Sequence, residues 1–450
     1  MFLRSLAISL PVLISQPATA QRAAPVTAAR AEAPVVLTAP QRAAAIADIV
    51  KVITERYVFP DRVAAIAAQL TDGLTSGRYE TDSPIVFAER VTADLRSSSR
   101  DRHMYLNYAP GEFAAAAAAP AGSDAPNPAL DAIWARQARR ANHGLEEMRI
   151  LPGNVRYLRI SGFQWVEDRS GAAYDAAMRF LGEGDAIVID LRGNGGGSHA
   201  AVRYLLSHFL PGDTLDMTFL QAGKEPVQSR TLEYLPAGRL SGRPLYVLID
   251  NGTGSAAEAF AYDVRQFRLG TLVGATTAGA ANNNGFYPIA PGFMLSYSFG
   301  TPLHPVSKSN WEAVGVAPDV VSDADRALDV AQSLALTALL DRAGADAGDV
   351  ADWNWARIAV AARLSPPRLP AATLRPLAGR YGVLQVVWRD GALFYVRRSG
   401  QQARLIPLTT DGLFAVEGFN DHFRIRLTGD AMETQWNDEP MPTRVSRTGS

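Results

Sequence analysis

The stretch of this chain at residues 245–261 reads LYVLIDNGTGSAAEAFA and combines the signals of a strand, a turn and a helix. Its first five residues are apolar, which predicts a strand buried on both faces, as in a parallel sheet. The glycine-containing turn that follows leads into a helix that begins at about Ser255. We therefore predict a strand, a turn and a helix belonging to an α/β layer domain, over roughly residues 150–335.

Ser255 can be interpreted in two ways. Glu258 follows three residues later, and this spacing matches a capping box, in which the serine caps the helix. Alternatively, the turn presents a reactive hydroxyl at the carboxyl end of a strand, where a helix N-terminus and free N–H groups can stabilise an oxyanion. The stretch by itself favours the cap.

A second glycine-rich stretch, residues 185–198, reads DAIVIDLRGNGGGS. An apolar strand opens here into a loop whose glycines permit positive φ angles and the close approach of a substrate to bare N–H groups. The loop can therefore supply a second oxyanion donor. An ordinary turn or a phosphate-binding loop is the alternative, but the stretch lacks both the Walker lysine and a spaced GxGxxG.

The composition is that of a globular protein of 450 residues, 47% hydrophobic, with a net charge of −1 and no cysteine. A charge so close to zero creates no field that would attract nucleic acid or an anionic membrane. The absence of cysteine excludes disulfides and thiol redox chemistry. We therefore expect no nucleic-acid partner and no cofactor.

The first 20 residues have the pattern of a secretion signal. Arg4 precedes an apolar run at 6–14, and Ala18-Thr19-Ala20 forms a cleavage site of small residues. The run is shorter than the roughly 20 residues that a membrane-spanning helix needs. We predict cleavage near Ala20, no membrane insertion afterwards, and a periplasmic or secreted location.

The periodicity of apolar residues divides the rest of the chain. Helical spacing dominates up to about residue 95, strands and helices alternate from Val155, and a Pro-rich break at 365–370 precedes a β-like tail with a hairpin signal at Asp390-Gly391. The expected units are a signal peptide (1–20), a linker (21–40), an N-terminal helical domain (41–108), a low-complexity linker and helix (109–150), the core (151–335), a helix and linker (336–370) and a small C-terminal β-domain (371–450).

A serine nucleophile requires a base, and the chain contains six histidines. Met104 and Leu106 alternate with His103, which predicts a strand with this histidine on its polar face, away from the core. We expect surface or helix-capping roles for the other five, which are His143, His199, His208, His304 and His422. No HExxH or paired His/Cys spacing occurs, so no metal site is predicted.

Taken in order, these stretches resemble the serine peptidase superfamily that includes the carboxyl-terminal processing proteases, the tricorn core protease and the interphotoreceptor retinoid-binding protein repeats. The resemblance spans most of residues 45–335. It implies an α/β, crotonase-like core of repeated ββα units after a helical domain, and the hydrolysis of peptide bonds. The matching stretches are Tyr57–Pro60, Asp101–His103, Gly153–Phe163, Asp190–Gly197, Gly254–Glu258, Gly274–Gly279 and Trp311–Asp319.

The resemblance also implies the roles of individual residues. Ser255 matches the nucleophile, and the N–H groups of Ala256 and Gly196 would form the oxyanion hole. One branch pairs the serine with a lysine further along the chain, but residues 276–287, TTAGAANNNGFY, contain none. This absence favours the tricorn-like branch.

In the tricorn-like branch a histidine and a glutamate support the serine, and His103 and Glu312 match them. His103 would accept the serine proton, while Glu312 would hold the imidazole tautomer and stabilise the imidazolium. Asp101 and Glu258 are candidate supporting residues.

The chain departs from the family in two places. Arg102 stands where the tricorn type has a second catalytic serine, and the PDZ domain of the processing branch is missing. Two alternatives to a peptidase remain: a carrier of apolar ligands on the same fold, or a serine esterase. A carrier would not require the complete set of His103, Ser255 and Glu312, so the expected function is a peptidase acting on a peptide or protein substrate.

Overall fold

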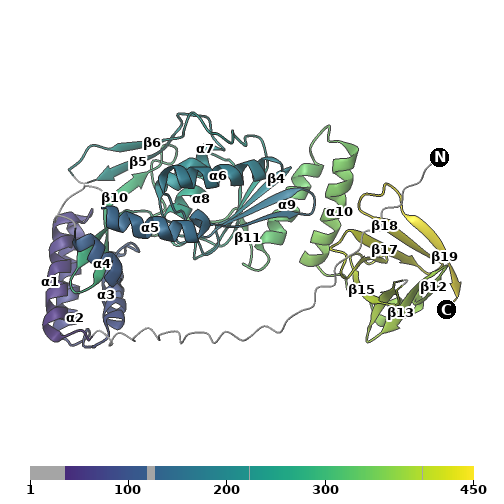
Figure 1. Ribbon diagram of the computed structural model, residues 1–450, viewed down its shortest axis with the longest axis horizontal. Helices are drawn as coiled ribbons and strands as arrows, with labels where there is room; N and C mark the ends of the chain where they lie inside the picture. The colour runs from purple at the N-terminus through teal and green to yellow at the C-terminus, as the bar shows by residue number, and fades with distance from the viewer. Residues whose placement is uncertain (1–35, 119–126, 222, 398, 450) are drawn as a thin grey trace, which may run out of the picture.

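The computed structural model describes residues 36–118, 127–221, 223–397 and 399–449. The predicted signal peptide and most of the predicted linker at 21–40 lie outside these ranges. A helical module, a mixed α/β core and a β-barrel follow one another along the long axis of the molecule (Figure 1). The mixed α/β fold with a helical N-terminal region agrees with the prediction.

Three helices form the N-terminal module, in the region where helical spacing of apolar residues dominates the sequence. A proline stands in the first turn of each helix, where its missing N–H costs nothing. Their apolar faces pack against a sheet of the core, where Phe293 and Leu295 join the same hydrophobic cluster as Ile49 and Phe87. The helices are α1 (Ala39–Arg56), α2 (Pro60–Thr75) and α3 (Pro84–Ser99).

A five-stranded sheet joins this module to the core. Strand β1 follows α3 and pairs antiparallel with β10, whose other partners are β5 and β9. The residues just before β1 are therefore fixed against the core although they belong to the N-terminal part of the chain. The strands are β1 (Tyr105–Tyr108), β5 (Leu215–Gln221), β6 (Val227–Arg230), β9 (Asn283–Ile289) and β10 (Phe293–Leu303).

A six-stranded sheet in the order β11-β8-β7-β4-β3-β2 forms the centre of the core, and all neighbours are parallel except β2 and β3. Every residue of β4 and β7 is buried, as the apolar stretches predict. The strands are β2 (Leu145–Leu151), β3 (Val155–Ile160), β4 (Ala186–Asp190), β7 (Leu245–Ile249), β8 (Thr271–Gly274) and β11 (Val320–Val321).

Helices cover both faces of this sheet. Helices α6, α7 and α8 bury Tyr174, Leu205 and Phe260 against one face, and α9 and α10 bury Leu336 and Trp353 against the other. The helices are α6 (Glu167–Gly182), α7 (His199–Ser207), α8 (Ala256–Gln266), α9 (Ala327–Leu340) and α10 (Ala347–Leu364). Between β1 and β2 lie α4 (Pro110–Ala117), α5 (Pro128–Arg140) and the short helix η1 (Asn142–Gly144).

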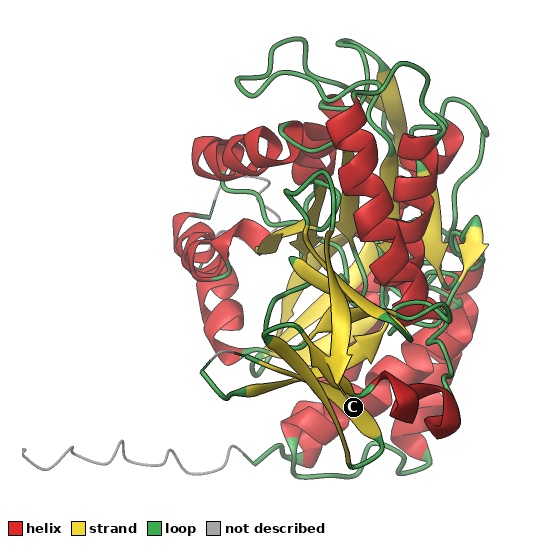
Figure 2. Cartoon of the chain, turned by 90° about the vertical axis from the view of Figure 1, so that its right-hand side faces the viewer, coloured by secondary structure: helices red, strands yellow, loops and turns green. Residues whose placement is uncertain are grey.

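The C-terminal region is a closed barrel of eight antiparallel strands, which faces the viewer in Figure 2. Strands β13 and β14 form the predicted hairpin around Asp390-Gly391. Arg424 connects the barrel to α10, because its guanidinium donates to the Trp355 carbonyl and lies 3.9 Å from the centroid of that indole ring. After α11 (Ala371–Leu374) and η2 (Arg375–Leu377), the strands are β12 (Gly379–Tyr381), β13 (Leu384–Arg389), β14 (Ala392–Val396), β15 (Gln402–Pro407), β16 (Leu413–Val416), β17 (Phe423–Thr428), β18 (Ala431–Trp436) and β19 (Thr443–Gly449).

The packing of α9 on the central sheet yields a test of the fold. Leu336 is fully buried and lies against Gly153, so Leu336→Ala leaves a cavity and should destabilise the core by roughly 2–5 kcal/mol. Val321→Ala is the control, because Val321 is 83% exposed. Thermal unfolding should show a lower midpoint for the first variant only. Equal midpoints for both variants would contradict this packing.

Candidate active site

Ser255 lies in the turn between β7 and α8, at the carboxyl end of the strand. Its φ of 52° and ψ of −120° are uncommon for a residue other than glycine. The turn is held from both sides: the Gly254 N–H donates to the Asn194 carbonyl at 2.9 Å, and the Thr253 hydroxyl donates to the Leu191 carbonyl at 2.9 Å. The glycine-rich loop after β4 therefore braces the serine turn.

Glu258 fixes the same turn from within the core. Its carboxylate is fully buried and accepts the N–H of Ser255 at 2.9 Å and the N–H of Ala280 at 2.8 Å. It also accepts the Gly279 N–H at 2.6 Å and the Thr277 hydroxyl at 2.5 Å. Burial raises the pKa of Glu258, and these donors oppose that effect. Through these hydrogen bonds Glu258 links the N–H of Ser255 to segment 277–280.

His103 contacts the side chain of Ser255. Its Nε2 lies 2.9 Å from the Ser255 Oγ. Its own N–H donates to the Asp101 side chain at 2.9 Å, and its carbonyl accepts the Ser296 hydroxyl at 2.6 Å. The prediction that His103 lies on the polar face of a strand, away from the core, was wrong. The residue precedes β1 in a turn and is only 6% exposed, so strand alternation does not apply to it.

Asp101 and Glu312 lie behind His103 and share Asn282. The Asn282 side-chain amide donates to Asp101 at 3.2 Å, and its backbone N–H donates to Glu312 at 3.1 Å. The Tyr57 hydroxyl also donates to Asp101, at 3.2 Å. This bond gives the stretch Tyr57–Pro60, which resembles the peptidase superfamily, a role in the site. Among the described residues the Nδ1 of His103 and the Oε1 of Glu312 are buried without hydrogen-bond partners, so these two side chains make no direct bond.

The charges around the imidazole favour a neutral base. Burial lowers the pKa of His103; the negative charge of Asp101 opposes this effect, and the positive charge of Arg96 adds to it. Burial, together with the charge of Asp101, raises the pKa of Glu312 to about 7. At neutral pH His103 is therefore free to accept a proton, and Glu312 is close to half protonated.

The glycine loop approaches the serine closely at Gly196. A Cβ on Gly196 would lie 2.6 Å from the Ser255 Cβ and 2.9 Å from the Ala256 nitrogen. The Gly196 N–H itself donates to the Asn194 side chain at 2.9 Å. In the part of the chain that the structure describes, the N–H groups of Gly197 and Ala256 have no acceptor. Two bare amides therefore stand beside the serine, as an oxyanion hole requires.

A cleft of about 690 Å³ opens at Ser255 and His103. A smaller recess of about 130 Å³ adjoins it, lined by Ser255, Ala256 and Gly197. Its remaining wall is mixed. Met217, Phe219, Ala259, Phe299 and Trp311 are among its apolar residues, and His199, Asn282, Asn283 and Asn284 are polar. Because a cavity of roughly 150 Å³ can hold benzene, the recess has room for one aliphatic side chain.

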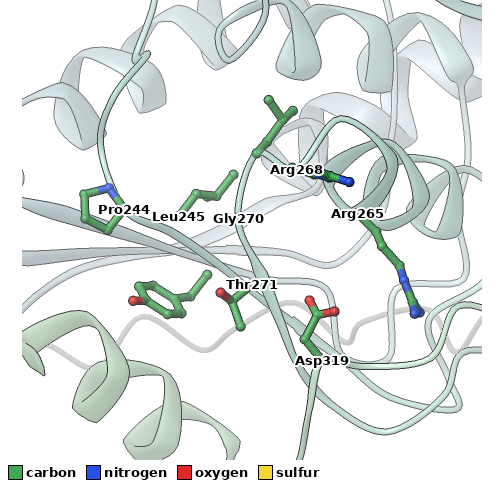
Figure 3. Close-up of a pocket in the computed structure, with 9 residues that line it drawn as sticks. Pro244, Leu245, Arg265, Arg268, Gly270, Thr271 and Asp319 are labelled. Carbon is green, nitrogen blue, oxygen red and sulfur yellow. The ribbon is translucent and has the colours of Figure 1, made fainter. Parts of the chain in front are cut away.

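Figure 3 shows another pocket, of about 410 Å³, at the amino ends of β7 and β8. Asp319 there accepts the Leu272 N–H at 2.8 Å, and Arg265 donates to the Ala317 carbonyl at 2.8 Å. Asp319 and Arg265 thus bond to the backbone of the chain itself, and the pocket lies at the opposite end of these strands from Ser255.

Three other histidines depart from the surface or capping roles that the sequence suggests. His143, His208 and His304 are buried. Their Nδ1 atoms lie 2.9 Å from the Ser170 hydroxyl, 2.7 Å from the Gly238 carbonyl and 3.1 Å from the Val306 nitrogen, respectively. These histidines are buried because the segments that carry or contact them fold toward the core. The local sequence does not indicate this burial. Within the described ranges, no group of three or more His, Asp or Glu side chains could hold a metal ion.

Sequence reasoning missed two asparagines that organise the site. Asn194 is fully buried and joins the glycine loop to the Ile160 carbonyl at 2.9 Å, besides its bonds to Gly196 and Gly254. Asn282 connects Asp101 with Glu312. Both stand inside the matching or neighbouring stretches, but an asparagine in a glycine-rich or polar segment carries no signal that separates it from an ordinary turn residue.

A serine in contact with an imidazole, beside bare backbone amides, defines the class of the serine hydrolase site. Residues 154–322 match the family described as peptidase family S41, and residues 28–140 match the N-terminal domain of peptidase S41 in eukaryotic IRBP. The chain belongs to peptidase family S41.

Three known proteins are similar to it. A carboxyl-terminal-processing protease of Synechocystis sp. is 29% identical over 179 residues, which span 38% of this chain and 38% of that protein. A lipoprotein from Streptococcus agalactiae is 16% identical, with a TM-score of 0.45 over 66% of this chain and 97% of its own. The photosystem II D1 C-terminal processing protease is 14% identical, with a TM-score of 0.38 over 63% and 93%.

The contact of Gly196 with Ser255 predicts a sharp difference between two adjacent glycines. In Gly196→Ala the added methyl would meet Ser255 and Ala256 at a φ of 108°, so reaction of Ser255 with a fluorophosphonate should slow at least a hundredfold. Gly195→Ala is the matched control, because nothing lies within 4 Å of its added methyl. Adduct formation followed by mass spectrometry measures both, and equal rates would contradict the geometry.

Proposed function

We propose that this protein is an exported serine-type peptidase that hydrolyses peptide bonds with Ser255, His103 and Glu312. One observation carries the proposal: the imidazole Nε2 and the serine Oγ, 152 residues apart in the chain, lie 2.9 Å from each other at a 690 Å³ cleft. A contact over this distance in sequence requires the helical module and the core to be fitted together. Family membership and the similarity to a carboxyl-terminal-processing protease support the reaction class.

The chemistry follows from the placement of these groups. His103 accepts the Ser255 proton as the Oγ attacks the substrate carbonyl carbon, and then donates it to the leaving amine. The oxyanion is stabilised by the Ala256 N–H and an N–H of the glycine loop. Of the two candidates in that loop, Gly196 already donates to Asn194, whereas Gly197 is free and is the better-suited donor. Water then hydrolyses the acyl-enzyme.

Glu312 supports His103 without bonding to it. Its carboxylate is held by the N–H groups of Ala281 and Asn282, and Asn282 in turn holds Asp101. In this arrangement Asp101 positions the His103 backbone, while Asp101 and Glu312 together supply the negative charge that stabilises an imidazolium. Both carboxylates thereby act as positioning residues.

The substrate class follows from the cleft and its recess. The recess opens beside Ser255 and the bare amides, so it would receive the side chain next to the scissile carbonyl, and its volume of about 130 Å³ limits that side chain to a small or medium one. Acyl transfer to serine serves esters as well as amides, and esterase activity is an expected side reaction.

We also assign the sheet domain to the crotonase type, in line with the family.

Export rests on the segment at residues 1–20, which lies outside the described residues. Arg4, the apolar run and Ala18-Thr19-Ala20 support a cleaved signal and a periplasmic or secreted peptidase. Along the ranges that the structure describes, no helix is both long and apolar enough to cross a bilayer.

A covalent probe tests the nucleophile. A fluorophosphonate should add once to the purified mature protein, at Ser255, and Ser255→Ala should abolish both this adduct and peptide turnover. Ser198→Ala is the matched control, because Ser198 also lines the cleft but caps α7. A correctly folded protein that forms no adduct would instead favour a carrier of apolar ligands.

The pH profile tests the base. Because the pKa of His103 is lowered from its ordinary 6.5, the neutral imidazole persists into mildly acidic solution. The value of kcat/KM should therefore fall from its plateau on acidification with a midpoint below 6.5, where protonation removes the base, and protonation of Glu312 near pH 7 should cause a smaller decrease, because Glu312 does not bond to the imidazole. His103→Ala should lose at least a hundredfold of the plateau rate. A profile unchanged in that variant would assign the base elsewhere.

A further inference from the structure

One histidine in the recess beside Ser255 is held by contacts that the catalytic arrangement does not use. His199 begins α7 and lines the recess of about 130 Å³ together with Ser255. Its Nε2 lies 2.9 Å from the Ser229 hydroxyl and 3.2 Å from a carboxylate oxygen of Asp216. Its ring also meets the Phe219 ring in a T-shaped contact, with the centroids 4.8 Å apart. These contacts fix the imidazole in the wall of the recess.

The same contacts determine which ring nitrogen of His199 carries a proton. Asp216 is fully buried beside Nε2, and a carboxylate only accepts hydrogen bonds. The Ser229 hydroxyl donates its single proton to Asp216 at 3.0 Å, so it cannot also donate to Nε2. Nε2 is therefore protonated, and in a neutral ring Nδ1 is an acceptor. The side chain of His199 makes no other hydrogen bond among the described residues, which leaves Nδ1 free.

Two asparagine side chains add acceptors to the same recess. The side-chain nitrogen of Asn282 donates to the Asp101 carboxylate, which can only accept, so the Asn282 Oδ1 has to face elsewhere. This Oδ1 and the Oδ1 of Asn283 are buried, and within the described ranges neither has a donor. Both asparagines line the recess. Buried oxygens without a donor are costly and rare, so these two point to a group that a ligand supplies.

Two side-chain donors in the wall of the recess are already engaged within the protein. The Asn284 side-chain nitrogen donates to the Ser296 hydroxyl at 2.7 Å, and the Trp311 indole N–H donates to the Ala280 carbonyl at 3.2 Å. Neither can therefore satisfy the free acceptors. A side chain that brings its own donor into the recess would complement them, whereas an apolar side chain of the same shape would leave them unpaired.

We propose that His199 and Asn283 make the recess selective for a side chain with a hydrogen-bond donor, a hydroxyl or a carboxamide, on the residue that contributes the scissile carbonyl. This inference rests on the proposed peptidase function and names its substrate class. A site built to hydrogen-bond a substrate group strongly rejects the analogue that lacks it, whereas an apolar pocket rejects an added hydroxyl only weakly. The volume of about 130 Å³ suits serine, threonine or asparagine.

Two pairs of peptides test the selectivity. Within each pair the sequences differ only at the residue before the cleaved bond, which is threonine or valine in one pair and asparagine or leucine in the other. At pH 8, which favours a neutral imidazole, the wild-type protein should cleave the donor-bearing peptide with a kcat/KM at least about tenfold higher than its apolar partner. Preference in only one pair identifies the hydroxyl or the carboxamide as the group bound. Absence of this preference in both pairs would overturn the proposal.

Substitutions test the two acceptors separately. His199→Leu and Asn283→Leu should each reduce the preference to about threefold or less, because each removes one acceptor at similar volume. His422→Leu is the matched control, because this exposed histidine does not line the recess and its loss should leave the preference intact. Asn283→Leu keeps the contact between His199 and Asp216, so it tests the recess even if His199→Leu fails to fold. A preference unchanged in every folded recess variant would refute the assignment.

A binding measurement separates this proposal from the peptidase proposal. In a Ser255→Ala background, titration calorimetry should show tighter binding of the donor-bearing peptides, and adding His199→Leu or Asn283→Leu should reduce the difference. If the peptides bind selectively but the wild-type protein hydrolyses none of them, the selective recess stands and the peptidase fails. If hydrolysis occurs without selectivity in either measurement, the selective recess fails and the peptidase stands.

Discussion

The buried carboxylate of Glu258 is the contact on which the site depends. Burying a charge is costly, and here the cost is offset because the carboxylate accepts four hydrogen bonds, three of them from the backbone. One of these bonds holds Ser255 in its positive-φ conformation, which otherwise costs about 1–3 kcal/mol. The others fix segment 277–280, which continues into Asn282 and the cluster behind His103. A change at this one carboxylate would therefore disturb both Ser255 and His103.

The helical module contributes to the chemistry through the sheet that it shares with the core. Pairing of β1 with β10 places His103 opposite α8, and the Ser296 hydroxyl, on β10, bonds to the His103 carbonyl. Tyr57, at the end of α1, bonds to Asp101. The module therefore does more than pack against the core, because it positions His103 and supplies part of its environment. Its apolar contacts with β10 keep the imidazole within reach of the serine.

The charges at the site are divided by position. Asp101, Glu258 and Glu312 lie behind the reacting groups, whereas Arg96 and Arg102 line the cleft where a substrate would lie. In the proposed mechanism Asp101 and Glu312 stabilise positive charge on the imidazole, whereas the two guanidiniums add positive charge to the cleft. The two sets still act on each other, because the charge of Asp101 opposes the lowering of the pKa of Arg96, and the charge of Arg96 lowers the pKa of His103.

Local patterns were enough to predict the buried strand and turn at 245–261, the glycine loop at 195–197, the N-terminal helices and the absence of a lysine base. Periodicity and glycine are signals carried by neighbouring residues, so they can be recognised without knowledge of the fold. Tertiary packing was needed to show that His103 is buried against Ser255, that Asn282 stands between Asp101 and Glu312, that Asn194 accepts the Gly196 N–H, and that the tail closes into a barrel. These features join segments distant along the chain, and such pairings depend on packing that no local pattern contains.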